Sequence, residues 1–291
     1  MDVMDITSDM IKKLRDKTGA GMMDCKRALE STGGDMDAAV EHLRKKGAAV
    51  AQKRADRSAK EGMIVTRVSS DGRTGAVVEI NCETDFVGRS DDFVNFANAV
   101  AETLEKHKPA TVEQLAALTT GSGKKVSEMM NDLLAKVGEK IDVRRFAVVS
   151  SADGAVSSYT HLGSKIGVLV EFGGLPAGDA GTAVGRDVAM QVAAMSPLVI
   201  SRDQVEKSLM ERELDIYRTQ AQNEGKPAQI VDKIATGRLE KFYQEVCLLE
   251  QTYIKDGGKT IKDFLQESGA KAGKPITVRK FLRFHLGEEG K

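Results

Sequence analysis

The residues best suited to chemistry form one run, Asn81-Cys82-Glu83-Thr84-Asp85-Phe86-Val87-Gly88-Arg89. It offers a thiol, a hydroxyl and two neighbouring carboxylates, which are the groups of a nucleophile and its proton-transfer partners. A cysteine attacks only as a thiolate, and the alternation before Cys82 places it on a buried face, where a thiol stays protonated. We therefore expect this run to bind a partner rather than to catalyse a reaction. The alternative is an enzyme that uses Cys82 as its nucleophile.

The rest of the sequence offers few parts for catalysis or metal binding. The histidines at 42, 107, 161 and 285 form no His-x-x-x-His pair and stand near no cysteine, so no metal site is predicted. The loop from Gly121 to Lys125 lacks the first glycine of a phosphate-binding loop and the serine or threonine after its lysine. The sequence therefore favours a binding protein without a cofactor over an enzyme.

A strand and a helix must hold the run at its two ends. Along the strand Gly75–Cys82, the two-residue period places the even-numbered residues 76 to 82 on one face, and Val77, Glu79 and Asn81 on the other. Ser90 or Asp91 caps the helix, whose buried stripe has three- and four-residue spacing and consists of Phe93, Phe96, Ala97, Val100 and Leu104. Phe86 belongs to neither pattern, so it is either a lid on its own sheet or an anchor for a partner.

A second copy of this unit follows 92 residues later and lacks the ring. The equivalent pairs are Gly75–Ile80 with Gly167–Phe172, Phe96 with Val188, Ala97 with Ala189, and Val100 with Val192. At the same offset, Asp85 falls on Ala177 and Phe86 falls on Gly178. Because the scaffold does not require the pair, we favour Phe86 as an anchor, since a ring that becomes buried on binding contributes about 1.5–3 kcal/mol.

Residues 1–56 predict a small three-helix module with a basic linker. Ser8 or Asp9 opens the first helix, Gly21 begins the second, and the third runs from Asp35 to a basic end at residues 45–47. Residues 44–60 contain seven lysines and arginines and a single acid, Asp56. This segment could contact RNA phosphates or an acidic face of another protein. The alternative is that it forms a solvated linker helix.

The body predicts an α+β fold in which two copies of one unit, residues 57–150 and residues 151–200 with 250–287, each form a small three-stranded antiparallel sheet with helices. The closing strand Ile141–Phe146 recurs as Ile276–Phe281 at an offset of 135, which exceeds the first offset by 43. An insertion of that size, residues 201–249, therefore interrupts the second copy.

The inserted segment predicts an antiparallel helical hairpin. Helical patterns at 203–223 and 228–255 are separated by Gly225-Lys226-Pro227, which enforces a turn. The predicted seam consists of Met210, Leu214, Tyr217, Ala221, Leu239, Phe242, Val246, Leu249 and Tyr253. Such an arm suits docking or dimerisation, and the alternative is that it packs along its own body.

Composition sets the remaining bounds. The 291 residues carry 43 lysines and arginines against 43 acids, so net charge gives no general attraction to nucleic acid or membrane. Three cysteines, at 25, 82 and 247, form no Cys-x-x-Cys pair and suit a reducing compartment. The acidic N-terminus and the lack of a long apolar run predict a cytoplasmic protein.

Two stretches resemble the signature sequences of the bacterial translation elongation factor Ts family. They are residues 14–29 (LRDKTGAGMMDCKRAL) and residues 79–87 (EINCETDFV). Residues 159–161 before 165–170, the turn at 225–227 and the strand at 281–287 are also similar, so the resemblance covers essentially the whole chain. Gly88 departs from the serine or alanine usual there, which would loosen the loop. The sequence ends at Lys291, where some members continue into a further helix that could contact the partner.

The resemblance implies an exchange factor and not an enzyme. It would bind elongation factor Tu in its GDP-bound and nucleotide-free states, disturb the magnesium site of that partner, and release GDP so that GTP can bind. Asp85 and Phe86 would enter the nucleotide domain of the partner, and Thr84 and Val87 would hold the loop. Further contacts would come from a ubiquitin-associated-like N-terminal module, through Met22, Met23 and Asp24, and from His161. No membrane or direct nucleic-acid contact is expected, and the hairpin would serve a homodimer or a further contact.

Overall fold

The computed structural model describes residues 6–53, 56–176 and 178–288. The helices are α1 Ser8–Thr18, α2 Met22–Ser31, α3 Met36–Lys53, α4 Asp85–Gly88, α5 Asp91–His107, α6 Val112–Ala117, α7 Val126–Val137, α8 Asp179–Met195, α9 Lys207–Asn223, α10 Ala228–Val246 and α11 Ile261–Ala272. Short 3-10 helices are η1 Arg202–Gln204 and η2 Leu248–Glu250. The strands are β1 Glu61–Val68, β2 Thr74–Cys82, β3 Ile141–Ser150, β4 Ala155–Thr160, β5 Ile166–Gly173, β6 Thr252–Tyr253, β7 Asp256–Thr260 and β8 Thr277–His285.

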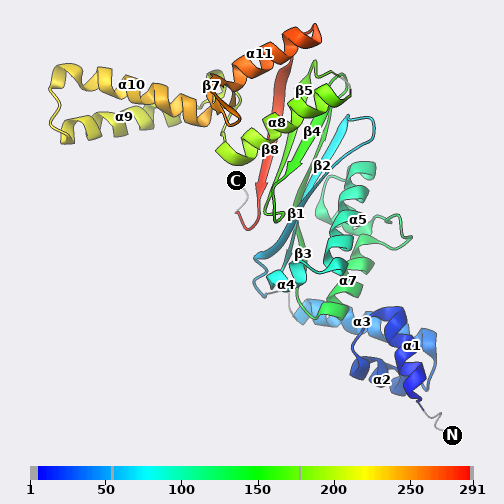
Figure 1. Cartoon of the computed structure of the whole chain (residues 1–291). Coiled ribbons are helices and arrows are strands. Elements are labelled where there is room, and N and C mark those ends of the chain that lie inside the picture. The colour runs from blue at the N-terminus through cyan, green and yellow to red at the C-terminus, as the bar shows by residue number, and fades with distance from the viewer. Residues whose placement is uncertain (1–5, 54–55, 177, 289–291) are drawn as a thin grey trace.

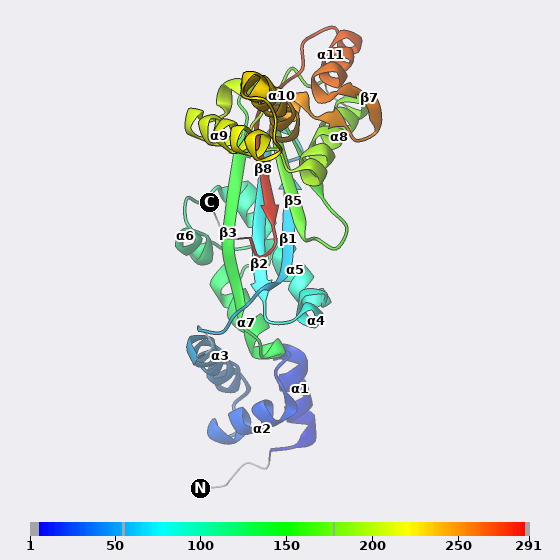
Figure 2. The same cartoon turned by 90° about the vertical axis from the view of Figure 1, so that its left-hand side faces the viewer.

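Two three-stranded antiparallel sheets, ordered β1-β2-β3 and β4-β5-β8, form the centre of the molecule. They lie next to each other, with α5 and α7 on the outer side of the first and α8 and α11 on the outer side of the second (Figure 1). In the view turned by 90°, the three N-terminal helices lie at one end of an elongated body and α9 and α10 at the other (Figure 2). The predicted α+β architecture is confirmed.

Three apolar clusters hold these layers together. One fills the space between the first sheet and its helices and includes Ile80, Phe93 and Phe96, which are buried. The second lies between the other sheet and its helices, around Phe172. The third lies between the sheets and consists of Ile64, Val77, Val149, Val156, Leu169 and Leu286, with Ala147, Leu282 and Phe284 at its edge. Both faces of β2 are therefore covered, as its unbroken burial requires.

The internal duplication is confirmed in the backbone. The register between β2 and β3 shifts between Glu79 and Ile80, and that between β5 and β8 shifts between Glu171 and Phe172. These positions are equivalent at the 92-residue offset. The extra residue is Arg144 on β3 and Arg279 on β8. A bulge bends the strand that carries the extra residue, so both copies bend their closing strand at the same place. The helical pairs predicted from the offset are also buried in both copies.

A glycine at equivalent places lets the two sheets approach each other. A β-carbon on Gly75 would lie 2.6 Å from the Cγ1 of Val156, and one on Gly167 would lie 2.4 Å from the Cγ2 of Ile64. Each glycine belongs to one copy and faces the sheet of the other. The repeated glycine therefore marks the contact between the copies.

The N-terminal module differs from its prediction at the end of its third helix. Helix α1 begins at Ser8, as predicted, and the cap is the preceding Thr7, whose hydroxyl accepts a hydrogen bond from the Met10 N–H at 3.3 Å. Helix α3 starts after Asp35 as expected, but it continues to Lys53 instead of ending near Gly47. The reason is tertiary packing, because Gly47 is buried in the middle of α3 against α7.

The insertion forms the expected antiparallel hairpin, which projects from the body, so packing along the body was the wrong alternative (Figure 1). Its second helix, α10, ends at Val246 rather than Lys255. There the backbone leaves the helix because Leu248 N–H bonds the carbonyl of Val199 and the Leu248 side chain enters the second core.

The predicted seam of the hairpin was therefore only partly right. The buried residues of α10 follow a four-residue spacing and are Val231, Ala235, Leu239 and Tyr243. Phe242 and Val246 are only partly buried beside them. Tyr253 and Leu249 belong to the second core and not to the seam. The first arm also starts later than predicted, because residues 202–204 form η1 and α9 begins at Lys207.

Candidate functional site

Phe86 lies on a single-turn helix, α4, between β2 and α5. Its side chain is 84% exposed. The other large apolar side chains of this region, such as Phe93 and Phe96, are buried in the first core. Phe86 is therefore not a lid on its own sheet, and that alternative was wrong. An exposed ring on a short ordered turn is available for contact with another molecule.

The residues around Phe86 hold the turn. Thr84 caps α4, because its hydroxyl accepts the N–H of Val87 at 3.4 Å. The Val87 side chain is partly buried against the first core. Asp85 faces outward and pairs with Arg89 at 3.0 Å. Of the four residues predicted here, Thr84 and Val87 thus face the scaffold, while Asp85 and Phe86 face solvent.

Two carboxylates fix the chain just before the turn. Glu139 accepts the backbone N–H of Thr84 at 3.0 Å and its hydroxyl at 2.7 Å. Glu83 in turn accepts the backbone N–H of Lys140 at 2.7 Å. Sequence reasoning missed Glu139, because it precedes β3 and lies 55 residues from Thr84. The sequence feature that could have identified Glu139 is its position as a carboxylate just before the strand that pairs with β2.

Gly88 closes the turn against β1. A β-carbon there would lie 3.3 Å from the Cα of Gly62 and 3.4 Å from the Sγ of Cys82. The glycine is helical and buried, and its N–H bonds the carbonyl of Thr84 at 3.2 Å. It therefore lets α4 lie close to the edge of the sheet.

The Cys82 thiol beneath the turn is unsuited to nucleophilic attack. It is buried and lies 3.0 Å from the carbonyl oxygen of Thr84. Burial, followed by the negative charges of Glu139 and Glu61, raises the pKa of the Cys82 thiol to about 12. Because the thiolate is the reactive form, this environment disfavours the reading of Cys82 as an enzyme nucleophile.

The predicted contacts in the N-terminal module divide into two kinds. Met22 and Met23, in the first turn of α2, are 47% and 64% exposed. Asp24 instead pairs within the module, with Lys46 at 2.6 Å and with Arg27. The hydrogen bond from Lys46 and then that from Arg27 hold the pKa of Asp24 below its ordinary value, against the opposing effect of burial. Met22 and Met23 are thus free for contact, while Asp24 already has internal partners.

His161 lies in the turn between β4 and β5, where its Nδ1 is 3.0 Å from the Tyr159 hydroxyl. Leu162 beside it is 90% exposed and was missed by sequence reasoning. Its signal was the same as that of Phe86, a large apolar residue on a connection expected at the surface.

A pocket of about 460 Å³ brings α4 and the β4–β5 turn together. Asp85, Gly88 and Arg89 line it from the first copy, and Gly163, Ser164 and Lys165 line it from the second. The two turns are joined through β1, whose Ile64 N–H bonds the carbonyl of Ser164 at 2.7 Å. The fold thus places the turn that carries Phe86 beside the turn that carries His161 and Leu162.

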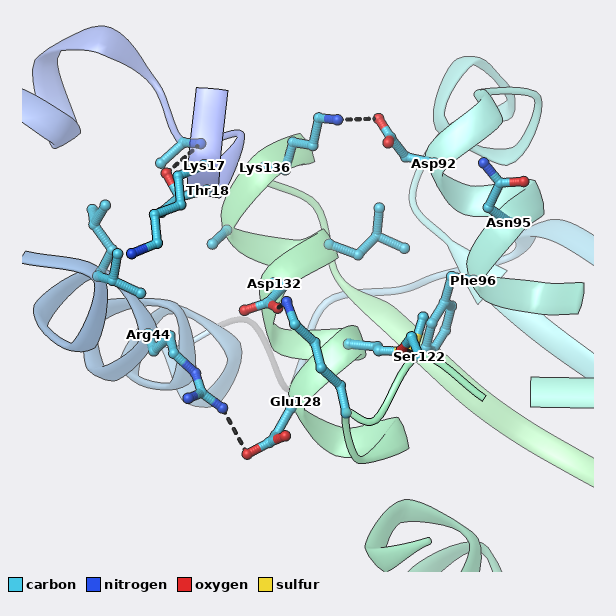
Figure 3. Close-up of a pocket in the computed structure, with 17 residues that line it drawn as sticks. Lys17, Thr18, Arg44, Asp92, Asn95, Phe96, Ser122, Glu128, Asp132 and Lys136 are labelled. Atoms are coloured by element: carbon cyan, nitrogen blue, oxygen red, sulfur yellow. Dashed lines mark hydrogen bonds and ion pairs between the residues drawn. The ribbon is translucent and has the colours of Figure 1, made fainter. Parts of the chain in front are cut away.

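A second pocket, of about 600 Å³, lies between the module and the body (Figure 3). Its basic head groups all pair with carboxylates. The pairs are Lys17 with Asp37, Arg44 with Glu128, Lys124 with Asp132, and Lys136 with Asp92. Of these four pairs, Arg44 with Glu128 joins the module to α7, and together they leave little unbalanced charge to attract an ionic ligand.

The basic segment is less positive than its sequence indicates. Lys45 pairs with Glu41, Arg57 pairs with Glu83, and Arg44 and Lys46 pair as described above. Lys53 and Arg54 lie outside the described side chains. Ion pairing therefore weakens the case for an RNA contact at this segment.

Two other kinds of feature are absent from residues 6–53, 56–176 and 178–288. These residues contain no group of three or more His, Cys, Asp or Glu side chains arranged to hold a metal ion. None of the helices formed by them is long and apolar enough to cross a membrane.

The sequence is similar to one family of known proteins along nearly its whole length. The sequence model of the family described as "Elongation factor TS" matches residues 83–288. The Elongation factor Ts of Chloroherpeton thalassium is 48% identical over 289 residues, covering 98% of this chain and 99% of the relative. That of Clostridium perfringens strain SM101 is 49% identical over 283 residues, covering 97% and 93%. That of Chlorobium phaeobacteroides is 47% identical over 285 residues, covering 97% and 99%.

Proposed function

We propose a function from the premise that this chain belongs to the elongation factor Ts family of translation elongation factors. It binds elongation factor Tu in its GDP-bound form, disturbs the magnesium site of that protein and promotes GDP release, so that GTP can bind. It breaks no covalent bond and is a nucleotide-exchange factor rather than an enzyme. Elongation factor Tu, GDP-bound or nucleotide-free, is its partner.

The observation that carries this proposal is the exposure of Phe86 on an ordered turn. The ring is 84% exposed, while the chain on both sides of it is fixed by hydrogen bonds and core contacts. In the proposed complex, Phe86 inserts between helices of the partner, and Asp85 leaves Arg89 to contact groups near the magnesium ion. Thr84 and Val87 keep the turn in place.

Other exposed groups supply general affinity in this proposal. Met22 and Met23 contact the nucleotide domain of the partner, Asp24 supports α2, and His161 contacts the remaining domains together with Leu162. The proposed units are the module at 1–56, the two core copies at 57–150 and at 151–200 with 250–287, and the hairpin at 201–249. The hairpin forms a further contact or a homodimer interface.

Thermodynamics restricts how such a factor works. If it bound the GDP-loaded and empty partner equally, it would shift no equilibrium, and each tenfold weakening of GDP requires about 1.4 kcal/mol of preference for the empty state. The coupling is reciprocal, so GDP or GTP with magnesium must weaken the complex by the same factor. One buried ring, worth about 1.5–3 kcal/mol, supplies one to two factors of ten.

The test is release of fluorescent GDP from elongation factor Tu in the presence of magnesium. The wild-type chain should accelerate release strongly, and Phe86→Ala should reduce that acceleration by about 10- to 100-fold, since it removes the buried ring. Ile254→Ala is a matched control, because Ile254 is an apolar residue that is 39% exposed on the β6–β7 connection. It should behave as wild type.

The outcomes separate the function from its cause. If Phe86→Ala accelerated release as well as wild type, the exchange function would stand and its cause would lie outside Phe86. If the wild-type chain gave no acceleration, the exchange function would be rejected. In that case, salt-dependent binding of tRNA would test the alternative of a basic RNA contact.

A further inference from the structure

We propose that Glu139 is a positioning residue, which holds the α4 turn in the conformation needed for nucleotide exchange. This role rests on the proposed function. Its carboxylate takes both donors of the residue before Asp85, with Oε2 accepting the Thr84 N–H at 3.0 Å and Oε1 accepting the Thr84 hydroxyl at 2.7 Å. The hydroxyl oxygen also accepts the N–H of Val87, inside α4. One carboxylate thus fixes the N-terminus of the turn.

The turn needs such an external support. Helix α4 has four residues, and a helix so short does not hold itself, because nucleation is unfavourable and few hydrogen bonds follow. The Phe86 ring is too exposed to anchor its own segment. The direction of the ring therefore follows from the backbone that Thr84 and Val87 hold.

The contact at Glu139 is half of a reciprocal clamp between residues 83–84 and residues 139–140. Glu83 accepts the Lys140 N–H at 2.7 Å and the guanidinium of Arg57 at 3.1 Å. The Lys140 ammonium donates to the carbonyl of Arg57 at 3.1 Å. Hydrogen bonds to ionised acceptors are stronger than those between neutral groups, so the clamp is well suited to restrain a short turn.

The second copy of the unit lacks both the clamp and the ring. At the 135-residue offset, Glu139 falls on Lys274 and Lys140 falls on Pro275. In place of a carboxylate contact, the carbonyl of Pro275 lies against Gly174, close enough that a β-carbon there would lie within 2 Å of the Pro275 oxygen. The clamp therefore accompanies the exposed ring and is not a requirement of the duplicated scaffold.

A purely structural role for Glu139 predicts a different effect of removing its side chain. Strand β2 is paired with β1 and with β3 as far as Cys82, independently of the Glu139 side chain. Loss of a structural support would loosen these strands together with the turn. Loss of a positioning residue should loosen the turn and leave the strand pairing intact.

The first measurement is hydrogen–deuterium exchange of individual amides in the free protein. In Glu139→Ala, the amides of Val87, Gly88 and Arg89 should exchange about tenfold faster, while those of Val78 and Ile80 stay unchanged. Glu139→Gln keeps a carbonyl acceptor for the Thr84 N–H, so it should restore most of the protection. Lys274→Ala, at the equivalent place in the second copy, is the matched control and should leave the turn unchanged.

The second measurement is GDP release from elongation factor Tu as a function of the concentration of each variant. If only a fraction of Glu139→Ala molecules presents the turn, the half-saturating concentration rises by the inverse of that fraction. We expect about a tenfold rise with the maximal rate within about twofold of wild type. Glu139→Gln should stay within about threefold of wild type.

Two results would overturn the assignment of Glu139. One is uniform acceleration of strand and turn amides, which would make the residue structural only. The other is unchanged protection of the turn in Glu139→Ala. If the wild-type chain released no GDP, the exchange function itself would fail, and the amide measurement alone would then decide whether Glu139 holds the turn.

Discussion

The two copies of the core unit differ at the connection where the central strand meets its helix. In the first copy, β2 leads through a clamped turn that exposes Phe86. In the second, β5 leads to α8 through a connection in which Leu175 packs against the second core. The strands, helices and bulges around these connections correspond. The duplicated scaffold therefore supplies rigidity, and one connection on it supplies the contact surface.

The copies also differ in how deeply they bury an equivalent carboxylate, Glu79 or Glu171. Glu79 is fully buried, bonds Arg145 at 2.7 Å and accepts the N–H of Gly287 at 2.9 Å, so it joins the first copy to the end of β8. Glu171 is 17% exposed and lies 3.8 Å from Arg279. Position in the repeat is shared, but the electrostatic environment is not.

Replacing these two glutamates should give the largest change in stability. Glu79→Ala leaves the Arg145 charge without its buried partner, and we expect it to lower the free energy of unfolding by about 3–5 kcal/mol. Glu171→Ala should cost about 1 kcal/mol. Urea denaturation of both variants measures the difference. Equal costs would contradict the view that the contact made by Glu79 is the stronger link between the copies.

The thiol of Cys82 gives an intermediate effect, which depends on pH. Its pKa of about 12 exceeds the ordinary value of 9.0, so folding favours the protonated thiol. This contribution to stability is fully present below pH 9 and is lost as the pH rises from about 9 towards 12. The unfolding temperature should therefore fall less steeply with pH across that range in Cys82→Ala than in the wild-type chain.

The same thiol should resist alkylation in the folded protein. At pH 8, the raised pKa reduces the thiolate fraction on the order of a thousandfold relative to an ordinary cysteine. Mass spectrometry of the Cys82 peptide after iodoacetamide treatment, compared with the unfolded chain, measures this protection. Rapid labelling of Cys82 in the folded state would instead revive the nucleophile reading.

The smallest effect concerns the cap of the helix that follows each connection. Ser90 caps α5 by accepting the Phe93 N–H at 3.4 Å, whereas Gly178 precedes α8 without a side-chain cap. Ser90→Ala should therefore cost about 1 kcal/mol. Thermal unfolding measures the loss, with Ser196→Ala at the other end of α8 as a comparison. No loss in Ser90→Ala would mean that core packing alone fixes the start of α5.

Local pattern and internal repetition determined the outline of this protein. The period of the strand at 75–82, the stripe of the helix after Ser90, and the offsets of 92 and 135 predicted both three-stranded sheets and the insertion. The contrast between Phe86 and Gly178 also predicted that the ring is exposed. These features depend on residues close in sequence or on comparison of one copy with the other.

Tertiary structure alone decided the features that join distant segments. Helix α3 passes Gly47 because α7 packs against it, and α10 stops at Val246 because the next residues pair with Val199 and enter the second core. The carboxylate of Glu139 reaches Thr84 only once β3 lies beside β2. Helix ends and side-chain clamps depend on small energy differences, and contacts across the fold supply those differences.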